Sequence, residues 1–160
     1  MRLALLATAL ALSASAAYAA GTHSGGHGYD EMAVGRPGKA EHVDRTIEVV
    51  MRETDDGEMV FEPASLSVKA GETIRFEVKN SGELEHEFVL DHHDKLMEHK
   101  ALMERFPEME HDDPNSIRLA EKTGGEVIWT FSNAGEFEFG CLIPGHYDAG
   151  MKGSVTVSAN

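Results

Sequence analysis

The chain has 160 residues, with 28 acidic against 14 basic side chains and a formal net charge of −14 at pH 7. This balance argues against a nucleic-acid-binding protein, because lysine and arginine are needed to neutralise phosphates. The length suits one domain with a full hydrophobic core, and a single cysteine excludes an internal disulfide.

The first 19 residues have the three parts of a secretory signal peptide. Arg2 gives a positive start, residues 3–12 form an apolar run, and residues 17–19 form a small-x-small cleavage site. We therefore expect residues 1–19 to be removed on export to the periplasm. The apolar run is too short for a retained membrane helix, and no later segment approaches ~20 apolar residues, so we expect no membrane span.

Residues 20–45 are rich in glycine and polar side chains and lack apolar periodicity, which predicts a flexible arm. The arm carries His23, His27 and Met32. These side chains could hold a metal ion loosely, or they could be incidental residues of a solvated tail, which the composition favours.

From residue 46 onward, short segments alternate between apolar and polar residues. In residues 73–80, for example, Ile74, Phe76 and Val78 alternate with polar and charged residues, as is typical of a half-buried strand. The other predicted strands are residues 47–51, 59–61, 66–68, 85–91, 126–131, 136–141 and 153–157. Seven or eight short strands predict an all-β domain over residues 46–160, built as a β-sandwich.

A helical segment interrupts the strands, within an insertion at about residues 91–125. Asp94 is suited to cap its start and Pro107 follows its end. The residues predicted to share one helix face are Leu96, His99, Leu102, Met103 and Phe106. The insertion also carries metal-binding residue types, namely His92, His93, Met97, Met109 and His111. These residues could form a second metal site. Alternatively, they could be ordinary packing residues of the helix and part of an acidic loop.

The single cysteine lies at the end of a predicted strand. Cys141 shares its face of that strand with Phe137 and Phe139, so its sulfur should point into the core. His146 and Met151 follow at intervals of five residues, with a Pro-Gly turn after the cysteine. This spacing lets one loop bring three donor atoms to a single ion.

A fourth donor is expected from another strand. His86 is the first residue of the stretch 86–90 within a predicted strand, and it shares a face of that strand with Phe88 and Leu90. A thiolate, two imidazoles and a weak thioether form the donor set of a mononuclear copper site, because soft sulfur holds Cu(I) and imidazole suits both oxidation states. A bound copper ion would also explain why one thiol persists in an oxidising compartment.

Two stretches, NSGELEHEFVL and GEFEFGCLIPGHYDAGMKGSVTV, resemble the cupredoxins, the blue-copper fold of plastocyanin, azurin and rusticyanin. The resemblance covers about residues 46–160. It implies a Greek-key β-sandwich with one type 1 copper ion, bound by His86, Cys141, His146 and Met151 and cycling between Cu(I) and Cu(II). The spacing on either side of His146 looks like that of rusticyanin.

Within that family, the acidic insertion and the ending CLIPGHYDAGMKG look most like the small periplasmic CopI-type cupredoxins associated with copper tolerance. One position departs from the pattern: Glu87 stands where many electron-carrying cupredoxins have Asn or Ser. In this family the backbone N–H at this position donates a hydrogen bond to the cysteine sulfur, and that bond does not depend on the side chain. A contact between the loops that the side chain at this position makes does depend on it.

Other interpretations of Cys141 are a buried core thiol, a zinc ligand and a catalytic nucleophile. A thioether is a poor zinc ligand, and no third orienting group accompanies a Cys-His pair. A multicopper oxidase needs further copper sites, so we expect no enzymatic activity.

Two functions then remain: a periplasmic copper-tolerance protein, or a soluble periplasmic electron carrier of the plastocyanin or rusticyanin type. The histidines and methionines outside the core site favour copper tolerance. The expected partners are copper ions and periplasmic redox or copper-transfer proteins, and the expected state is a monomer.

Overall fold

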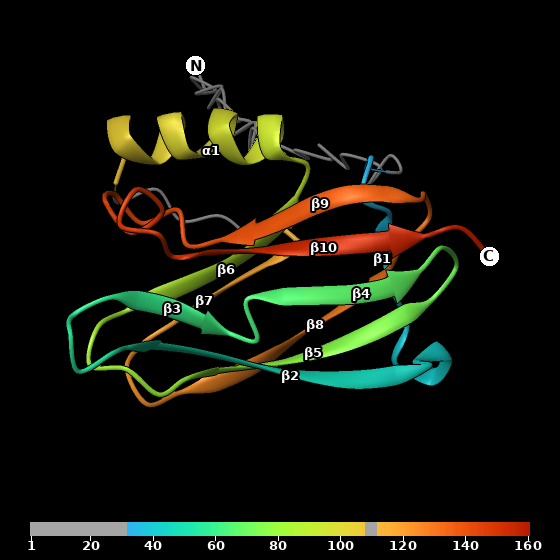
Figure 1. Cartoon of the computed structure of the whole chain (residues 1–160), viewed down its shortest axis with the longest axis horizontal. Helices are drawn as coiled ribbons and strands as arrows, with labels where there is room; N and C mark the ends of the chain where they lie inside the picture. The colour runs from blue at the N-terminus through green and yellow to red at the C-terminus, as the bar shows by residue number, and fades with distance from the viewer. Residues whose placement is uncertain (1–31, 108–111) are drawn as a thin grey trace, which may run out of the picture.

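The apolar faces of the strands meet between two five-stranded sheets in the computed structural model, which describes residues 32–107 and 112–160 (Figure 1). The first sheet has the order β1 (Arg36–Pro37), β8 (Gly124–Thr130), β5 (Thr73–Asn80), β2 (Arg45–Glu53) and β3 (Met59–Glu62). The second has the order β4 (Ser65–Lys69), β10 (Lys152–Ser158), β9 (Gly135–Gly140), β6 (His86–Asp91) and β7 (Ser116–Leu119).

The chain passes back and forth between the two sheets, as in a Greek-key sandwich, which confirms the predicted fold class. Strand β2 pairs in parallel with β5, and β10 pairs in parallel with β4, while the other pairs are antiparallel. Parallel neighbours cannot be joined by a tight hairpin, so the chain crosses between the sheets. These crossings bring β6 beside β9.

Aromatic side chains fill the space between the sheets. The rings of Phe88 and Phe139 stack with centroids 5.4 Å apart, and Phe61 meets Phe139 edge-on at 5.1 Å. Full burial of one such side chain stabilises the fold by roughly 1.5–3 kcal/mol. Cys141 and Met151 belong to this same core cluster.

One helix, α1 (His93–Arg105), covers the outer face of the second sheet (Figure 1). The strand beneath it, β6, is therefore buried at all of its positions, including those that face away from the main core. A second apolar cluster lies there, formed by Val89, Leu96, Met103, Leu142 and Tyr147. The helix thus packs directly on residues that neighbour the cysteine and the loop after it.

The helix was predicted correctly, but two of the residues assigned to its buried face are exposed. Leu96 and Met103 are fully buried, whereas Leu102 and Phe106 are 44% and 52% exposed. The helix contacts the sheet along a narrow strip. Leu96 and Met103 both lie on this strip, because residues seven apart fall on the same line along a helix. The N-cap is His92, which makes no side-chain cap bond, and Asp94 lies in the first turn.

Two of the strands, β7 and β1, were not predicted from the sequence. Strand β7 lies inside the predicted insertion and pairs with β6, so the insertion is not wholly helix and loop. Strand β1 lies in the segment predicted as an arm. There Val34 is fully buried, and its carbonyl accepts a hydrogen bond from the indole N–H of Trp129 at 3.2 Å. Strand β1 joins this segment to the domain by pairing with β8, while the 3-10 helix η1 (Ala40–His42) that follows has no buried residues.

The predicted signal peptide, His23, His27, Met109 and His111 lie outside the described residues. Within residues 32–107 and 112–160, no helix has the length and apolar character needed to cross a membrane.

Candidate metal centre

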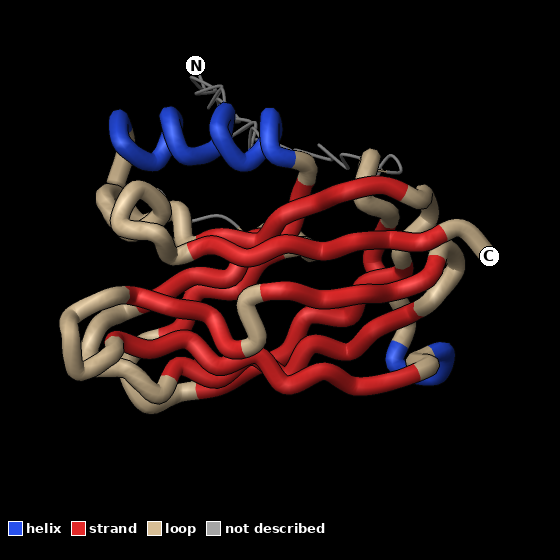
Figure 2. The backbone as a smooth tube through the Cα atoms, in the orientation of Figure 1, coloured by secondary structure: helices blue, strands red, loops and turns tan. Residues whose placement is uncertain are grey.

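The loop after β9 lies at the end of the sandwich that is remote from the C-terminus (Figure 2). His86 is the first residue of β6, and Cys141 directly follows β9. One candidate ligand atom from each of His86, Cys141 and His146 lies within 4.8 Å of the others. The structure therefore brings these three predicted residues together.

The loop from Cys141 to Met151 closes on itself through its backbone. Cys141 N–H donates to the carbonyl of Met151 at 3.1 Å, and Met151 N–H donates to the carbonyl of His146 at 3.1 Å. A turn bond from His146 N–H to Ile143 carbonyl, 3.0 Å long, spans Gly145, whose φ of 89° favours glycine. The predicted turn is confirmed, and it returns the chain to the cysteine.

Met151 is fully buried and its backbone lies across from Cys141. This places its thioether in the same core cluster as the cysteine sulfur. Its role as a weak fourth donor stays a prediction.

The Cys141 sulfur is fully enclosed and accepts a hydrogen bond from the Glu87 backbone N–H at 3.3 Å. This is the backbone hydrogen bond to sulfur that the family resemblance implied, and it does not involve the Glu87 side chain. Burial raises the pKa of the Cys141 thiol to about 12, against the lowering effect of N–H groups of Glu87 and Ile143. The free thiol is therefore protonated at neutral pH, and a metal ion must displace this proton to bind.

His86 is fully buried, and its two ring nitrogens have different surroundings. Its Nε2 lies 2.8 Å from Oε1 of Glu53, while its Nδ1 has no hydrogen-bond partner among the described residues. A buried nitrogen without a partner is costly unless another group satisfies it. A metal ion held with Cys141 and His146 would do so.

His146 is half-buried, so it is the one member of the four that reaches solvent. Its Nδ1 lies 3.3 Å from Cys141 Sγ, and the centroids of the His86 and His146 rings are 5.2 Å apart. Burial, followed by the proximity of His86, lowers the pKa of His146. Both effects favour the neutral imidazole, which is the form that binds metals.

The second set of predicted donors is not assembled in the described part of the chain. His92 and His93 are exposed beside the start of α1, and His93 Nδ1 is paired with Glu138 Oε2 at 3.1 Å. Among the described residues, the only group of three or more His, Cys, Asp or Glu side chains close enough to hold an ion is the one at Cys141.

Residues 48–158 match the plastocyanin/azurin family of copper-binding proteins. The chain belongs to this family. A protein of Rubrivivax gelatinosus named copper-resistant cuproprotein CopI is 44% identical, over 98% of this chain and 96% of the relative. A Pseudomonas aeruginosa protein of the same name is 38% identical, over 78% and 82% respectively. The solved structure of auracyanin B is similar with a TM-score of 0.58 and 26% identity, over 72% of this chain and 90% of that one.

The donor set fits the copper ion that this family binds. One buried thiol, two imidazoles and a buried thioether combine soft sulfur with nitrogen, which suits copper in both oxidation states. The Nδ1 of His86, which has no hydrogen-bond partner among the described residues, could bind the same copper ion.

Glu53 is a neighbour of the site that the sequence did not reveal, since its Oε1 lies 2.8 Å from Nε2 of His86. It ends β2, 33 positions before His86, and nothing in its local pattern distinguishes it from other acidic residues at strand ends. Its contact with His86 depends on how the turn after β5 folds back over the end of β2.

Proposed function

We propose that this protein is a periplasmic type 1 copper protein that contributes to copper tolerance by holding one copper ion with His86, Cys141, His146 and Met151. The observation that carries the proposal is the convergence of three ligand atoms within 4.8 Å, together with a buried ring nitrogen of His86 that has no hydrogen-bond partner in the part of the chain that the structure describes. The similarity to two relatives named for copper resistance supports the biological role.

When bound, the copper ion supplies one-electron chemistry between Cu(I) and Cu(II). The chain's own residues prepare the site for it. Cys141 would give up its thiol proton, His86 and His146 would each offer a ring nitrogen, and the surrounding core keeps water away from the sulfur. His146 is the ligand through which electrons or incoming copper would pass, because it alone of the four reaches solvent.

We do not assign an enzymatic activity to this site. A nucleophilic cysteine requires an accessible thiolate, and the Cys141 thiol is fully buried with a raised pKa. Export of the protein rests on the signal-peptide pattern in residues 1–19.

The site is tested by loading the purified protein with Cu(II) and recording its visible spectrum. An intense thiolate-to-copper charge-transfer band is expected, and Cys141→Ser should abolish it. His93→Ala is the matched control, since it removes a histidine outside the cluster and should leave the band intact. A folded, copper-loaded protein without this band would refute the ligand assignment.

The biological role needs a separate experiment in a deletion strain. Growth on elevated copper should fall, and the wild-type gene should restore it while the Cys141→Ser gene should not. Respiration without added copper is measured in parallel. Normal copper tolerance together with a respiratory defect would contradict the proposal and favour the electron carrier.

A further inference from the structure

The carboxylate of Glu53 lies behind the buried ring of His86. Oε1 of Glu53 is 2.8 Å from Nε2 of His86, and the two side chains are 22% and 0% exposed respectively. Glu53 comes from the last position of β2, in the opposite sheet from His86. The contact therefore joins the two sheets at the end where the predicted ligands gather.

The turn after β5 holds this carboxylate in place. The backbone N–H of Glu83 donates to Oε2 at 2.8 Å, and the N–H of Leu84 donates to Oε1 at 3.2 Å. Gly82 allows the close approach, because a Cβ there would lie 2.5 Å from Oε2. Both carboxylate oxygens are thus fixed by backbone, and the side chain is not free to leave His86.

A carboxylate in this position determines the tautomer of the histidine. An ionised carboxylate only accepts hydrogen bonds, so Nε2 of His86 must carry the proton. The proton-free lone pair is then on Nδ1, the atom with no hydrogen-bond partner among the described residues. A histidine that donates to a carboxylate is a more basic ligand, since the negative charge stabilises positive charge on the ring.

We propose that Glu53 is a positioning residue that fixes His86 with Nδ1 free for the metal and stabilises Cu(II) relative to Cu(I). This inference rests on the proposed copper site. Its consequence is a lower reduction potential than the same four ligands would give with a neutral partner behind His86. The greater basicity of the ring and the nearby negative charge both favour the ion of higher charge.

The alternative is that Glu53 only caps the turn at residues 82–84. A capping role would lower the free energy of unfolding when Glu53 is replaced, but it would not change the potential of the bound copper. The reduction potential therefore separates the two roles.

The experiment compares E53Q, E53D and E83Q with the wild type, all loaded with copper, by redox titration of the visible band. Glutamine keeps an acceptor for the turn but removes the charge, and aspartate keeps the charge but is too short to maintain the contact. Glu83 is the matched control: it lies in the same turn, it carries the same charge, and its exposed side chain pairs with Lys122 rather than His86.

The potential should rise in both E53Q and E53D and stay close to the wild-type value in E83Q. Loss of an outer hydrogen bond to a ligating histidine typically weakens metal binding by roughly 10–100-fold. If the tenfold loss falls on Cu(II) alone, the potential rises by about 59 mV. An unchanged potential in E53Q, or a wild-type potential in E53D, would overturn the positioning role.

Nitrogen NMR of the diamagnetic Cu(I) protein gives a second readout. The wild type should show the His86 proton on Nε2, and a proton on Nδ1 would overturn the inference. The failure of the copper site itself is recognised separately, because the wild-type protein would then lack the charge-transfer band. A normal band with an unchanged potential in E53Q contradicts only the role of Glu53.

Discussion

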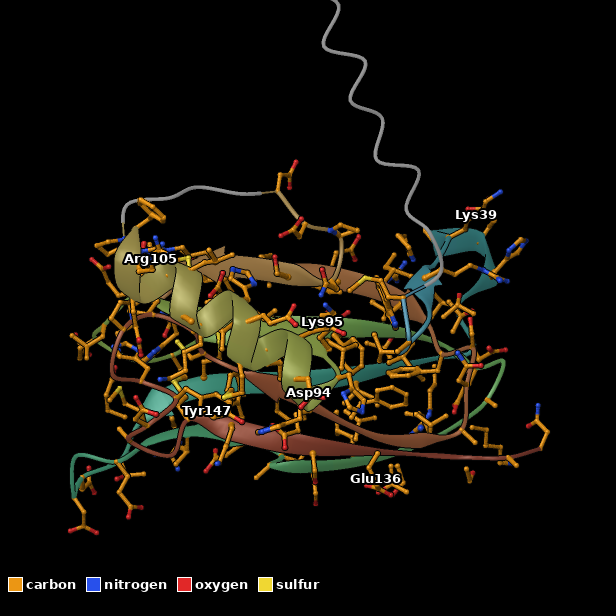
Figure 3. The ribbon with its side chains drawn as sticks, turned by 90° about the horizontal axis from the view of Figure 1, so that it is seen from above. Lys39, Asp94, Lys95, Arg105, Glu136 and Tyr147 are labelled. Atoms are coloured by element: carbon orange, nitrogen blue, oxygen red, sulfur yellow. The ribbon has the colours of Figure 1, made fainter. Side chains whose placement is uncertain are left out.

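The hydroxyl of Tyr147 donates a 2.6 Å hydrogen bond to Oε2 of Glu138, which joins the loop carrying His146 to strand β9. Tyr147 directly follows His146, and its buried ring packs with Leu96 and Met103 of α1. Figure 3 shows Tyr147 beside the helix, whose first turn holds Asp94 and whose end is Arg105. The helix insertion therefore contacts the ligand loop on the outer face of the sheet.

Removing this hydroxyl tests how strongly the contact holds the loop. Tyr147→Phe keeps the ring and loses one bond to a carboxylate, so the free energy of unfolding should fall by about 1.5–3 kcal/mol. Urea unfolding of the copper-free protein measures it. The control is Thr156→Val, which removes an exposed hydroxyl bonded to Glu136 at 2.9 Å and should cost much less. Equal stability of Tyr147→Phe and wild type would contradict the expectation.

The same contact predicts a dependence of stability on pH. Burial opposes ionisation of Glu138, but hydrogen bonds from Tyr147 and His93 outweigh it, so the pKa of Glu138 is lowered below its ordinary value of 4.5. A lowered carboxyl pKa contributes stability above the unfolded-state pKa, and this stability is lost as pH falls through the folded-state pKa. The wild type should therefore be more stable than Glu138→Gln at pH 7.

The difference between wild type and Glu138→Gln should shrink as pH falls below 4.5. Urea unfolding at a series of pH values measures it, with the exposed Glu136→Gln as control on the same strand. A difference that stays constant from neutral to acidic pH would show that the charge of Glu138 is not responsible.

Local alternation was enough to predict the strand that carries the cysteine. Phe137, Phe139 and Cys141 share one face and are all buried, because a period of two fixes the direction of each side chain within a strand. The loop after it could also be predicted, since its donors lie within a few residues of one another.

Features that depend on packing between distant segments could not be predicted in this way. The exposure of Leu102 and Phe106 depends on the angle at which α1 lies on the sheet, which helical spacing does not specify. Strand β7 offers only Ile117 and Leu119 as an alternating pair, too short a pattern to distinguish from a loop. The contact of Glu53 with His86 joins two sheets, so no local pattern contains it.

The helix insertion should stabilise the domain through one strip of its surface. Leu96→Ala removes a fully buried side chain from the cluster with Leu142 and Tyr147, and should cost roughly 2–5 kcal/mol. Leu102→Ala is the matched control on the same helix, because Leu102 is 44% exposed, and its effect should stay within about 0.5 kcal/mol. Urea unfolding measures both, and similar losses in the two variants would mean that the helix packs by another face.

Asn80 should control the turn that leads into His86. Its fully buried amide nitrogen lies 2.7 Å from Leu84 carbonyl and 3.0 Å from Leu119 carbonyl, and its oxygen accepts the Gly82 N–H at 3.0 Å. Asn80→Ala leaves these backbone groups without their partner inside the protein, at about 1–3 kcal/mol for each group that stays unsatisfied. The free energy of unfolding should fall accordingly.

A second effect of Asn80→Ala is expected on copper, because the loosened turn carries both the N–H groups that hold Glu53 and the start of β6. Copper affinity, measured by competition with a chelator, should fall together with stability. Asn133→Ala is the control, since the Asn133 amide donates to a backbone carbonyl at 3.1 Å in an exposed position. If Asn80→Ala lost stability but kept its full copper affinity, His86 would have to be positioned by β6 and Glu53 alone, without help from the turn.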